Sequence, residues 1–160
     1  MDCVRLNEII FTGKQNIKWK EVEQYLKKYA GKSFVVNKYG DELHINTLFA
    51  NEYTESQYTK KLKGSLAKVK ANIVQVLPQL IESATNRRWI ENKKEKHVNN
   101  AGKGWYRYDT YFCVSVQGAN EQEIRWNYYV ATLIVRINDQ GLYLYDIINI
   151  KKEARTPRES

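Results

Sequence analysis

The sequence has too few cysteines and histidines for a disulfide framework or a structural metal centre. It holds two of each among 160 residues. Cys3, Cys113, His44 and His97 are scattered singly rather than placed at zinc-ligand spacing. A chain of this length can bury a core without either aid. We therefore expect no metal, and Cys113, inside an apolar segment, is expected to be a buried free thiol.

Long hydrophobic runs are missing too. No apolar stretch approaches the ~20 residues that cross a bilayer. The start, "MDCVRLNEIIFTG", lacks the basic segment and apolar block of a secretory signal. The sequence therefore predicts no membrane span and a cytoplasmic location. A phosphate-binding glycine loop, a serine elbow and an HExxH helix are also absent, so an enzyme of this sequence would work without metal or cofactor.

Positive charge is what the sequence has in excess. There are 26 Lys and Arg residues against 18 Asp and Glu, a formal net charge of +8. Such a surface attracts phosphates or an acidic partner, although a generically basic protein is the alternative. Five lysines lie largely off an apolar helical stripe, on either a solvated face or a phosphate-facing surface. They are Lys60, Lys61, Lys63, Lys68 and Lys70.

The N-terminal half predicts helices around one hairpin. Apolar residues at helical spacing predict a helix in "KWKEVEQYLKKYAGK". The stretch "SFVVNKYGDELHINTLF" predicts a hairpin with its turn at residues 39–41. A capping box at Thr54 and Gln57 is expected to start a long helical block that continues to Ala84. Pro78 should kink or divide this block, because proline removes a backbone donor.

The C-terminal half changes to strand periodicity. Residues 86–104 are polar, basic and rich in glycine at their end, and predict a helix tail running into a loop. The three predicted strands cover residues 105–116, 125–137 and 142–151. The turn at residues 138–141 makes the last two an antiparallel hairpin. Helices followed by an antiparallel sheet indicate an α+β domain. We expect it to span 51–160, with 1–50 as an accessory piece or part of the same domain.

Polar and aromatic side chains share the predicted sheet. Alternation puts Arg107 and Asp109 on one half-polar face, which suits a site on the sheet or an ion pair between the two. Twelve tyrosines and four tryptophans suit either stacking on unpaired bases or packing in the core. His97, in "KHVNNAGKGWYRYD", has the right ordinary pKa for a general acid or base. RNA cleavage by the 2′-hydroxyl needs only such groups and cations.

Three segments add a resemblance to a known family. "NKKEKHVNNAGKGWYRYDTYF", "RWNYYVATLIVR" and "GLYLYDIINIKKEARTP" resemble C-terminal domains of polymorphic toxins and of large polyvalent phage and conjugative-element proteins. These domains are grouped with the Barnase–EndoU–colicin–RelE-like ribonucleases, and the resemblance covers about residues 55–157. It implies N-terminal helices followed by a twisted antiparallel sheet. It also implies a metal-independent endoribonuclease that leaves a 2′,3′-cyclic phosphate.

The resemblance also implies roles for individual residues. His97 takes the place of the histidine at the helix–sheet junction and Arg107 that of the first-strand cation. Lys151 or Lys152 takes the place of the last-strand cation, and Thr156 supplies a hydroxyl near the end. Substrate contacts are expected from Lys96, Lys103, Tyr106, Asp109, Arg125, Tyr129 and Lys152.

One departure leaves alternatives open. EndoU-type enzymes use two histidines, whereas His44 lies outside the resembling region, so either another residue makes the second proton transfer or the domain is inactive. The expected partners are RNA, with tRNA as one option, and an acidic immunity or antitoxin protein. The expected location is the cytoplasm of the producing or target bacterial cell. The alternatives are a non-catalytic nucleic-acid-binding module of a mobile element and a protein-interaction domain with a basic face.

Overall fold

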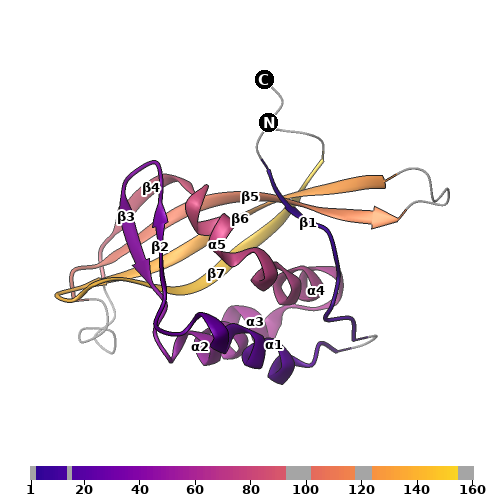
Figure 1. Ribbon diagram of the computed structural model, residues 1–160, viewed down its shortest axis with the longest axis horizontal. Coiled ribbons are helices and arrows are strands. Elements are labelled where there is room, and N and C mark those ends of the chain that lie inside the picture. Colours follow the sequence, from indigo (N-terminus) through magenta and orange to yellow (C-terminus); the bar gives the residue numbers. More distant parts are fainter. Residues whose placement is uncertain (1–2, 14–15, 93–101, 118–123, 155–160) are drawn as a thin grey trace.

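The three segments of alternating residues form the long strands of the structure. A computed structural model describes residues 3–13, 16–92, 102–117 and 124–154 (Figure 1). The long strands are β5 (Trp105–Gln117), β6 (Ile124–Asn138) and β7 (Gly141–Glu153). Each pairs antiparallel with the next, and a tight turn joins β6 to β7. The three strands and the final hairpin are therefore confirmed.

Short strands complete a mixed sheet. β1 (Val4–Leu6) pairs parallel with β5, and β3 (Asp41–His44) pairs parallel with β7. β2 (Ser33–Val36) forms the predicted hairpin with β3. The strand order is β1–β5–β6–β7–β3–β2. The α+β class is confirmed, but the expectation of a purely antiparallel sheet is wrong, because β1 and β3 add to the long strands in the parallel direction.

A further strand replaces the predicted helix tail. β4 (Thr85–Ile90) pairs antiparallel with β5, on the same edge as β1. Its polar sequence does not show strand alternation clearly, because an outer strand buries little of its surface. Trp89 fixes it further, since its Nε1–H donates to the carbonyl of Lys103 at 2.9 Å.

The predicted long helical block is several short helices. The helical elements are α1 (Trp19–Leu26), η1 (Lys27–Tyr29), α2 (Phe49–Glu55), α3 (Gln57–Lys61), α4 (Gly64–Asn72), η2 (Ile73–Val76) and α5 (Leu77–Glu82). Ser56 caps α3, so the expected capping box at Thr54 and Gln57 is wrong. The block divides at extended residues 62–63 and again at η2, before Pro78. Pro78 lies in the first turn of α5, where its missing N–H costs no helical bond.

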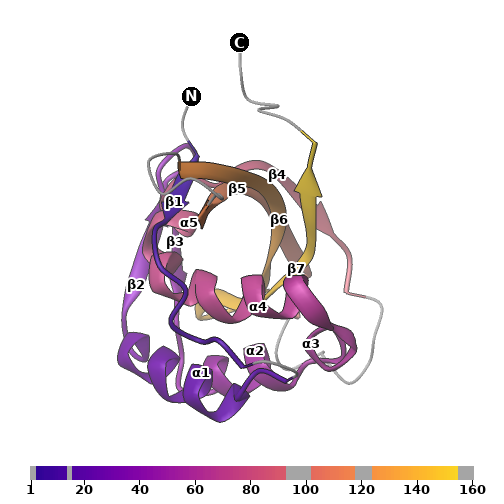
Figure 2. The same cartoon turned by 90° about the vertical axis from the view of Figure 1, so that its right-hand side faces the viewer.

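The sheet curls around one core. Figures 1 and 2 show α4 and α5 against its concave side, with α1, α2 and α3 grouped below α4. Tyr108, Thr110 and Phe112 are fully buried on the inner face of β5, opposite the face that carries Arg107 and Asp109. Cys113 is buried and free, as expected.

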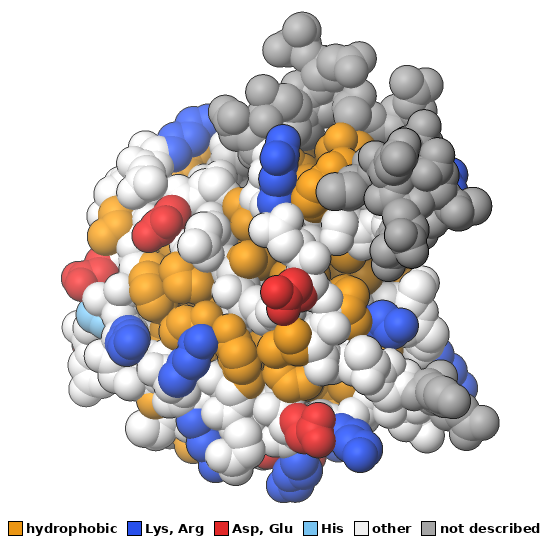
Figure 3. Space-filling view, turned by 45° about the vertical axis from the view of Figure 1, so that its right-hand side comes forward, with side chains coloured by type: hydrophobic (Ala, Val, Ile, Leu, Met, Phe, Trp, Pro, Cys, Tyr) orange, Lys and Arg blue, Asp and Glu red, His pale blue; other side chains and the backbone are white. Residues whose placement is uncertain are grey.

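The positive charge is spread rather than gathered on the face shown in Figure 3. Hydrophobic side chains cover a broad central area there, and Lys and Arg side chains lie at separate places around it. The net charge alone therefore does not mark a binding surface on this face, and a site has to be sought in particular clusters.

Candidate functional site

Four charged side chains come together where α2 and α4 meet β6 and β7. Lys70 Nζ lies 2.6 Å from Asp146 Oδ1, with the two side chains 0% and 2% exposed. Arg136 Nη1 lies 2.9 Å from Glu52 Oε2, with exposures of 5% and 21%. We call these four residues the charged cluster. Asp146 also acts electrostatically on Glu52, so the two pairs adjoin each other.

A strand irregularity accounts for the burial of Asp146. Opposite it, Val135 pairs with Leu144 and Ile134 with Asp146, which leaves Tyr145 as an extra residue in β7. Leu144 and Asp146 are buried, and so is Ile147, the residue directly after Asp146. The extra residue thus changes the simple in–out alternation.

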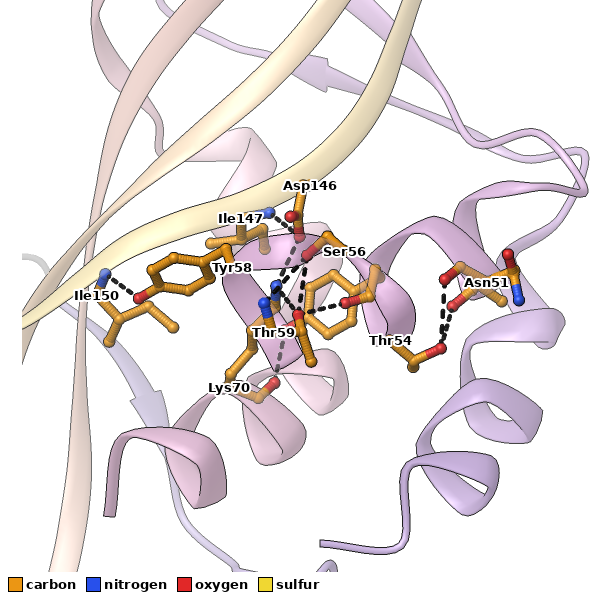
Figure 4. A network of polar contacts seen from close by, with 11 residues as sticks. Asn51, Thr54, Ser56, Tyr58, Thr59, Lys70, Asp146, Ile147 and Ile150 are labelled. Carbon is orange, nitrogen blue, oxygen red and sulfur yellow. Dashed lines mark hydrogen bonds and ion pairs between the residues drawn. The ribbon is translucent and has the colours of Figure 1, made fainter. Parts of the chain in front are cut away.

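Aromatic rings and hydroxyls surround Lys70 (Figure 4). Its Nζ donates to Thr59 Oγ1 at 2.5 Å and lies 4.4 Å and 5.0 Å from the ring centroids of Tyr53 and Tyr58. Thr59 Oγ1 in turn donates to the carbonyl of Tyr53 at 2.7 Å. The buried ammonium therefore has an anion, a hydroxyl and two ring faces as partners. Lys70 was expected on a solvated or phosphate-facing lysine surface, and this is wrong because it is buried and paired with Asp146.

Burial shifts the pKa of both members of the inner pair. Desolvation raises the pKa of Asp146 and lowers that of Lys70, and the attraction between them opposes both shifts. Asp146 Oδ1 also accepts a hydrogen bond from the Ile147 N–H at 2.8 Å. Each charged group thus depends on a close partner, so we assign this pair a structural role in the site.

Glu52 is a carboxylate with unused hydrogen-bonding capacity. Burial raises its pKa, the nearby Arg136 opposes this shift, and Asp146 adds to it. Its Oε1 atom is buried and has no hydrogen-bond partner among the residues that the structure describes. Such a carboxylate suits proton transfer, because its pKa moves toward neutral pH.

A row of side chains crosses the sheet beside Glu52. Register pairs Trp105 with Arg136, Arg136 with Tyr143 and Tyr143 with His44, across β5, β6, β7 and β3. We call these four residues the sheet row. The Arg136 guanidinium lies 6.0 Å from the Tyr143 ring and 5.6 Å from that of Tyr145. The Trp105 and Tyr145 rings are 5.3 Å apart, and His44 lies 5.2 Å from Tyr143. Trp105, Tyr143 and Tyr145 are partly exposed.

Several predicted site residues lie at or near this row. Arg107 is two residues from Trp105 on the same face of β5. Asp109 pairs with Arg88 at 3.1 Å, so the alternative of an Arg107–Asp109 ion pair is not what the structure shows. Lys103 lies just before β5, and its Nζ is 3.3 Å from Asp139.

Other predicted residues lie elsewhere. Lys151 and Lys152 pair with Val130 and Tyr129, so Lys151 is roughly 20 Å along β6 from Arg136, at about 3.3 Å per residue. Arg125 is farther along the same strand, opposite Val116. The structure therefore does not bring these cations to the sheet row.

Two of the predicted substrate-contacting residues contact other side chains of the protein. Tyr129 is buried and stacks on Phe112 with ring centroids 5.3 Å apart, so its assignment as a substrate contact is corrected to a core residue. Tyr106 lies under the guanidinium of Arg87, 4.8 Å from the ring centroid. The predicted residues Lys96, His97 and Thr156 lie outside the described residues.

Sequence reasoning missed Glu52, Arg136 and Asp146. A signal was present for two of them, since "LIVRI" and "YLYDI" each place one charge inside an apolar strand. A buried charge of this kind needs a partner. The partner itself could not be read from the sequence, because Lys70 is 76 residues away from Asp146.

Comparisons with known proteins found no match. No family model, curated protein or solved structure matches the chain. Within the described part of the chain, no group of three or more His, Cys, Asp or Glu could hold a metal ion. None of the described helices is long and apolar enough to cross a membrane.

Proposed function

We propose that the protein is a metal-independent endoribonuclease that binds single-stranded RNA along the sheet row. The observation that carries the proposal is the position of Glu52 beside Arg136 and a row of partly exposed aromatic residues. Glu52 is a carboxylate with a raised pKa, and one of its oxygens has no hydrogen-bond partner among the described residues. RNA, and an acidic immunity or antitoxin protein that would cover a basic site, are the partners that this activity implies.

Binding would rest on stacking and charge. Bases unpaired in single-stranded RNA stack on aromatic side chains, and the partly exposed Trp105 and Tyr143 lie on either side of Arg136 in the sheet. Arg107 on the same face and Lys103 just before β5 supply positive charge for the phosphates. Neither contact requires a particular base, so the proposal does not name a sequence.

Cleavage would use the 2′-hydroxyl as the nucleophile. Glu52 accepts its proton once its side chain turns to bring the buried Oε1 to the surface. The 2′-oxygen then bonds to phosphorus, and the bond from phosphorus to the 5′-oxygen breaks. A histidine donates a proton to that leaving oxygen, and Arg136 offsets the added negative charge. The candidates for this donor are His44, at the end of the row, and His97, eight residues before Trp105 in sequence. The products are a 2′,3′-cyclic phosphate and a 5′-hydroxyl.

One observation favours a second candidate, a binding module without cleavage. Arg136 is almost fully buried and already paired with Glu52, so its charge is partly neutralised. In that case the rings and cations would bind RNA and the buried pair would only support them.

The test is incubation of the full chain with total RNA in excess EDTA, followed by analysis of the 3′ ends. The variants are Glu52→Gln, His44→Ala and His97→Ala. Glu55→Gln, an exposed carboxylate on the same helix, is the matched control. We expect cyclic phosphate ends from the wild type and the control, and a loss of about 10²-fold or more in Glu52→Gln and in one histidine variant. Intact RNA with retained, salt-sensitive binding would reject the enzyme and leave the binding module.

A further inference from the structure

A separate cavity lies between the N-terminal segment and the α3–α4 connection. Its volume is about 1030 Å³, at the upper limit of small-molecule sites. Trp19 and Thr12 line it on the N-terminal side, and Lys60, Lys63 and Lys68 line it on the helical side. None of these residues belongs to the charged cluster or the sheet row.

The charges around this cavity have one sign. Three lysines line it, and the described residues of its lining include no aspartate or glutamate. All three are exposed, and none forms an ion pair with another residue in the described ranges. Three unpaired cations around one concave surface attract an anion more strongly than three separate surface lysines.

The remaining lining fits a ligand that is more than an anion. Trp19 supplies a half-buried ring, and Thr12 and Ser65 supply hydroxyl groups. A cation, a ring and hydroxyls together match the phosphate, base and sugar of a nucleotide. Thr59 forms part of the wall, and its hydroxyl is held by Lys70 and by the carbonyl of Tyr53. The hydrogen bond from Lys70 to Thr59 thus connects this wall to the charged cluster.

We propose that this cavity is a nucleotide-binding site, distinct from the sheet row and independent of any cleavage there. The ligand chemistry is a phosphate group joined to a base. It can come from a free nucleotide or from one unit of a nucleic acid, and the experiment separates these two sources.

The test measures binding of 5′-fluorescein-labelled dT8, which lacks the 2′-hydroxyl and cannot be cleaved by the proposed ribonuclease. Fluorescence anisotropy is recorded for the full chain with EDTA, with adenosine 5′-diphosphate or inorganic pyrophosphate as competitor. The site variant is K60Q/K63Q/K68Q. The control, K27Q/K32Q/K61Q, removes the same charge from exposed lysines that do not line the cavity. Both are first checked for cooperative urea unfolding.

The expected result is a loss of affinity of about tenfold or more in the site variant and less than about threefold in the control. Adenosine diphosphate should compete better than pyrophosphate, and Trp19→Leu should remove that difference. Competition by adenosine diphosphate identifies a free nucleotide as a ligand, and binding of dT8 alone identifies a nucleic acid. Equal losses in the two triple variants, or equal competition by pyrophosphate, would overturn the proposal. Neither result depends on whether RNA is cleaved.

Discussion

The charged cluster places four ionisable side chains in or near the core, and each is stable there only because of its partner. Lys70 and Asp146 are the most buried pair, and water reaches neither. Bringing two ions out of water costs as much as their attraction returns, so such a pair adds little net stability. Breaking it is a different matter, because the remaining charge stays buried.

Lys70→Met tests this dependence. It leaves the Asp146 carboxylate buried without its cation, and we expect the free energy of unfolding in urea to fall by about 3–5 kcal/mol. The double variant Lys70→Met/Asp146→Leu should regain a large part of the loss, because it removes both charges. A loss below about 1 kcal/mol in the single variant would show that water reaches Asp146 after all.

Glu52 makes a prediction about pH. Its pKa in the folded protein is raised above the ordinary value of 4.5, so the folded state holds this proton more tightly than the unfolded chain does. The contribution of Glu52 to stability is therefore complete below the unfolded pKa and is lost as pH rises through the folded pKa. Urea unfolding from about pH 4 to about pH 7 should show a larger fall in stability for the wild type than for Glu52→Gln. Parallel curves would mean that its pKa is ordinary.

At the scale of elements, the outer strand β4 is held by a close contact with the start of β5. Gly104 has a φ of +96°, and a Cβ placed there would lie 2.6 Å from Trp89 Nε1 and 2.8 Å from the Ile90 carbonyl oxygen. Only glycine lets the two segments approach this closely. The contact positions Trp105, the next residue, at the end of the sheet row.

Gly104→Ala should therefore separate β4 from β5. Gly40→Ala is its control, since Gly40 also has a positive φ, +72°, but has nothing within 4 Å of the added Cβ. We expect a cost of about 1–2 kcal/mol for Gly40→Ala from backbone strain alone. Gly104→Ala should cost at least about 1 kcal/mol more in urea unfolding, because Trp89 must also move. Equal costs would show that the contact with Trp89 is unimportant.

At the scale of the whole molecule, residues 1–50 share the sheet and the core with the rest of the chain. β1 pairs with β5 and β3 pairs with β7. Val22, Leu26 and Leu43 belong to the same buried cluster as Leu133. A chain that begins at residue 51 would lack β1 and β3. It would expose the edges of β5 and β7 that pair with them, and also the core beneath α1.

We therefore predict that a fragment of residues 51–160 does not fold on its own. Circular dichroism during urea titration should show no cooperative transition for the fragment, whereas the full chain should unfold in a single step. The loss of core contacts with residues 1–50 is the physical reason. A cooperative transition in the fragment would instead make residues 1–50 an accessory piece.

The sequence alone determined the local parts of this protein. The period of two in β5, β6 and β7, the hairpin of β2 and β3, and the helix at α1 were predictable because each depends on neighbours in the chain. The excess of positive charge was equally visible. The same patterns could not reveal β4, since an outer strand of polar residues resembles a loop.

Only the tertiary structure decided which distant residues meet. Glu52, Lys70, Arg136 and Asp146 come from four elements, and nothing near any of them in the sequence shows which partner it meets. The parallel pairing of β1 with β5, and that of β3 with β7, likewise joins strands roughly 100 residues apart in the sequence. Contacts between such distant residues leave no local sequence pattern. A charged side chain can be buried only where the fold brings a partner beside it, so the tertiary structure decides which charges are buried.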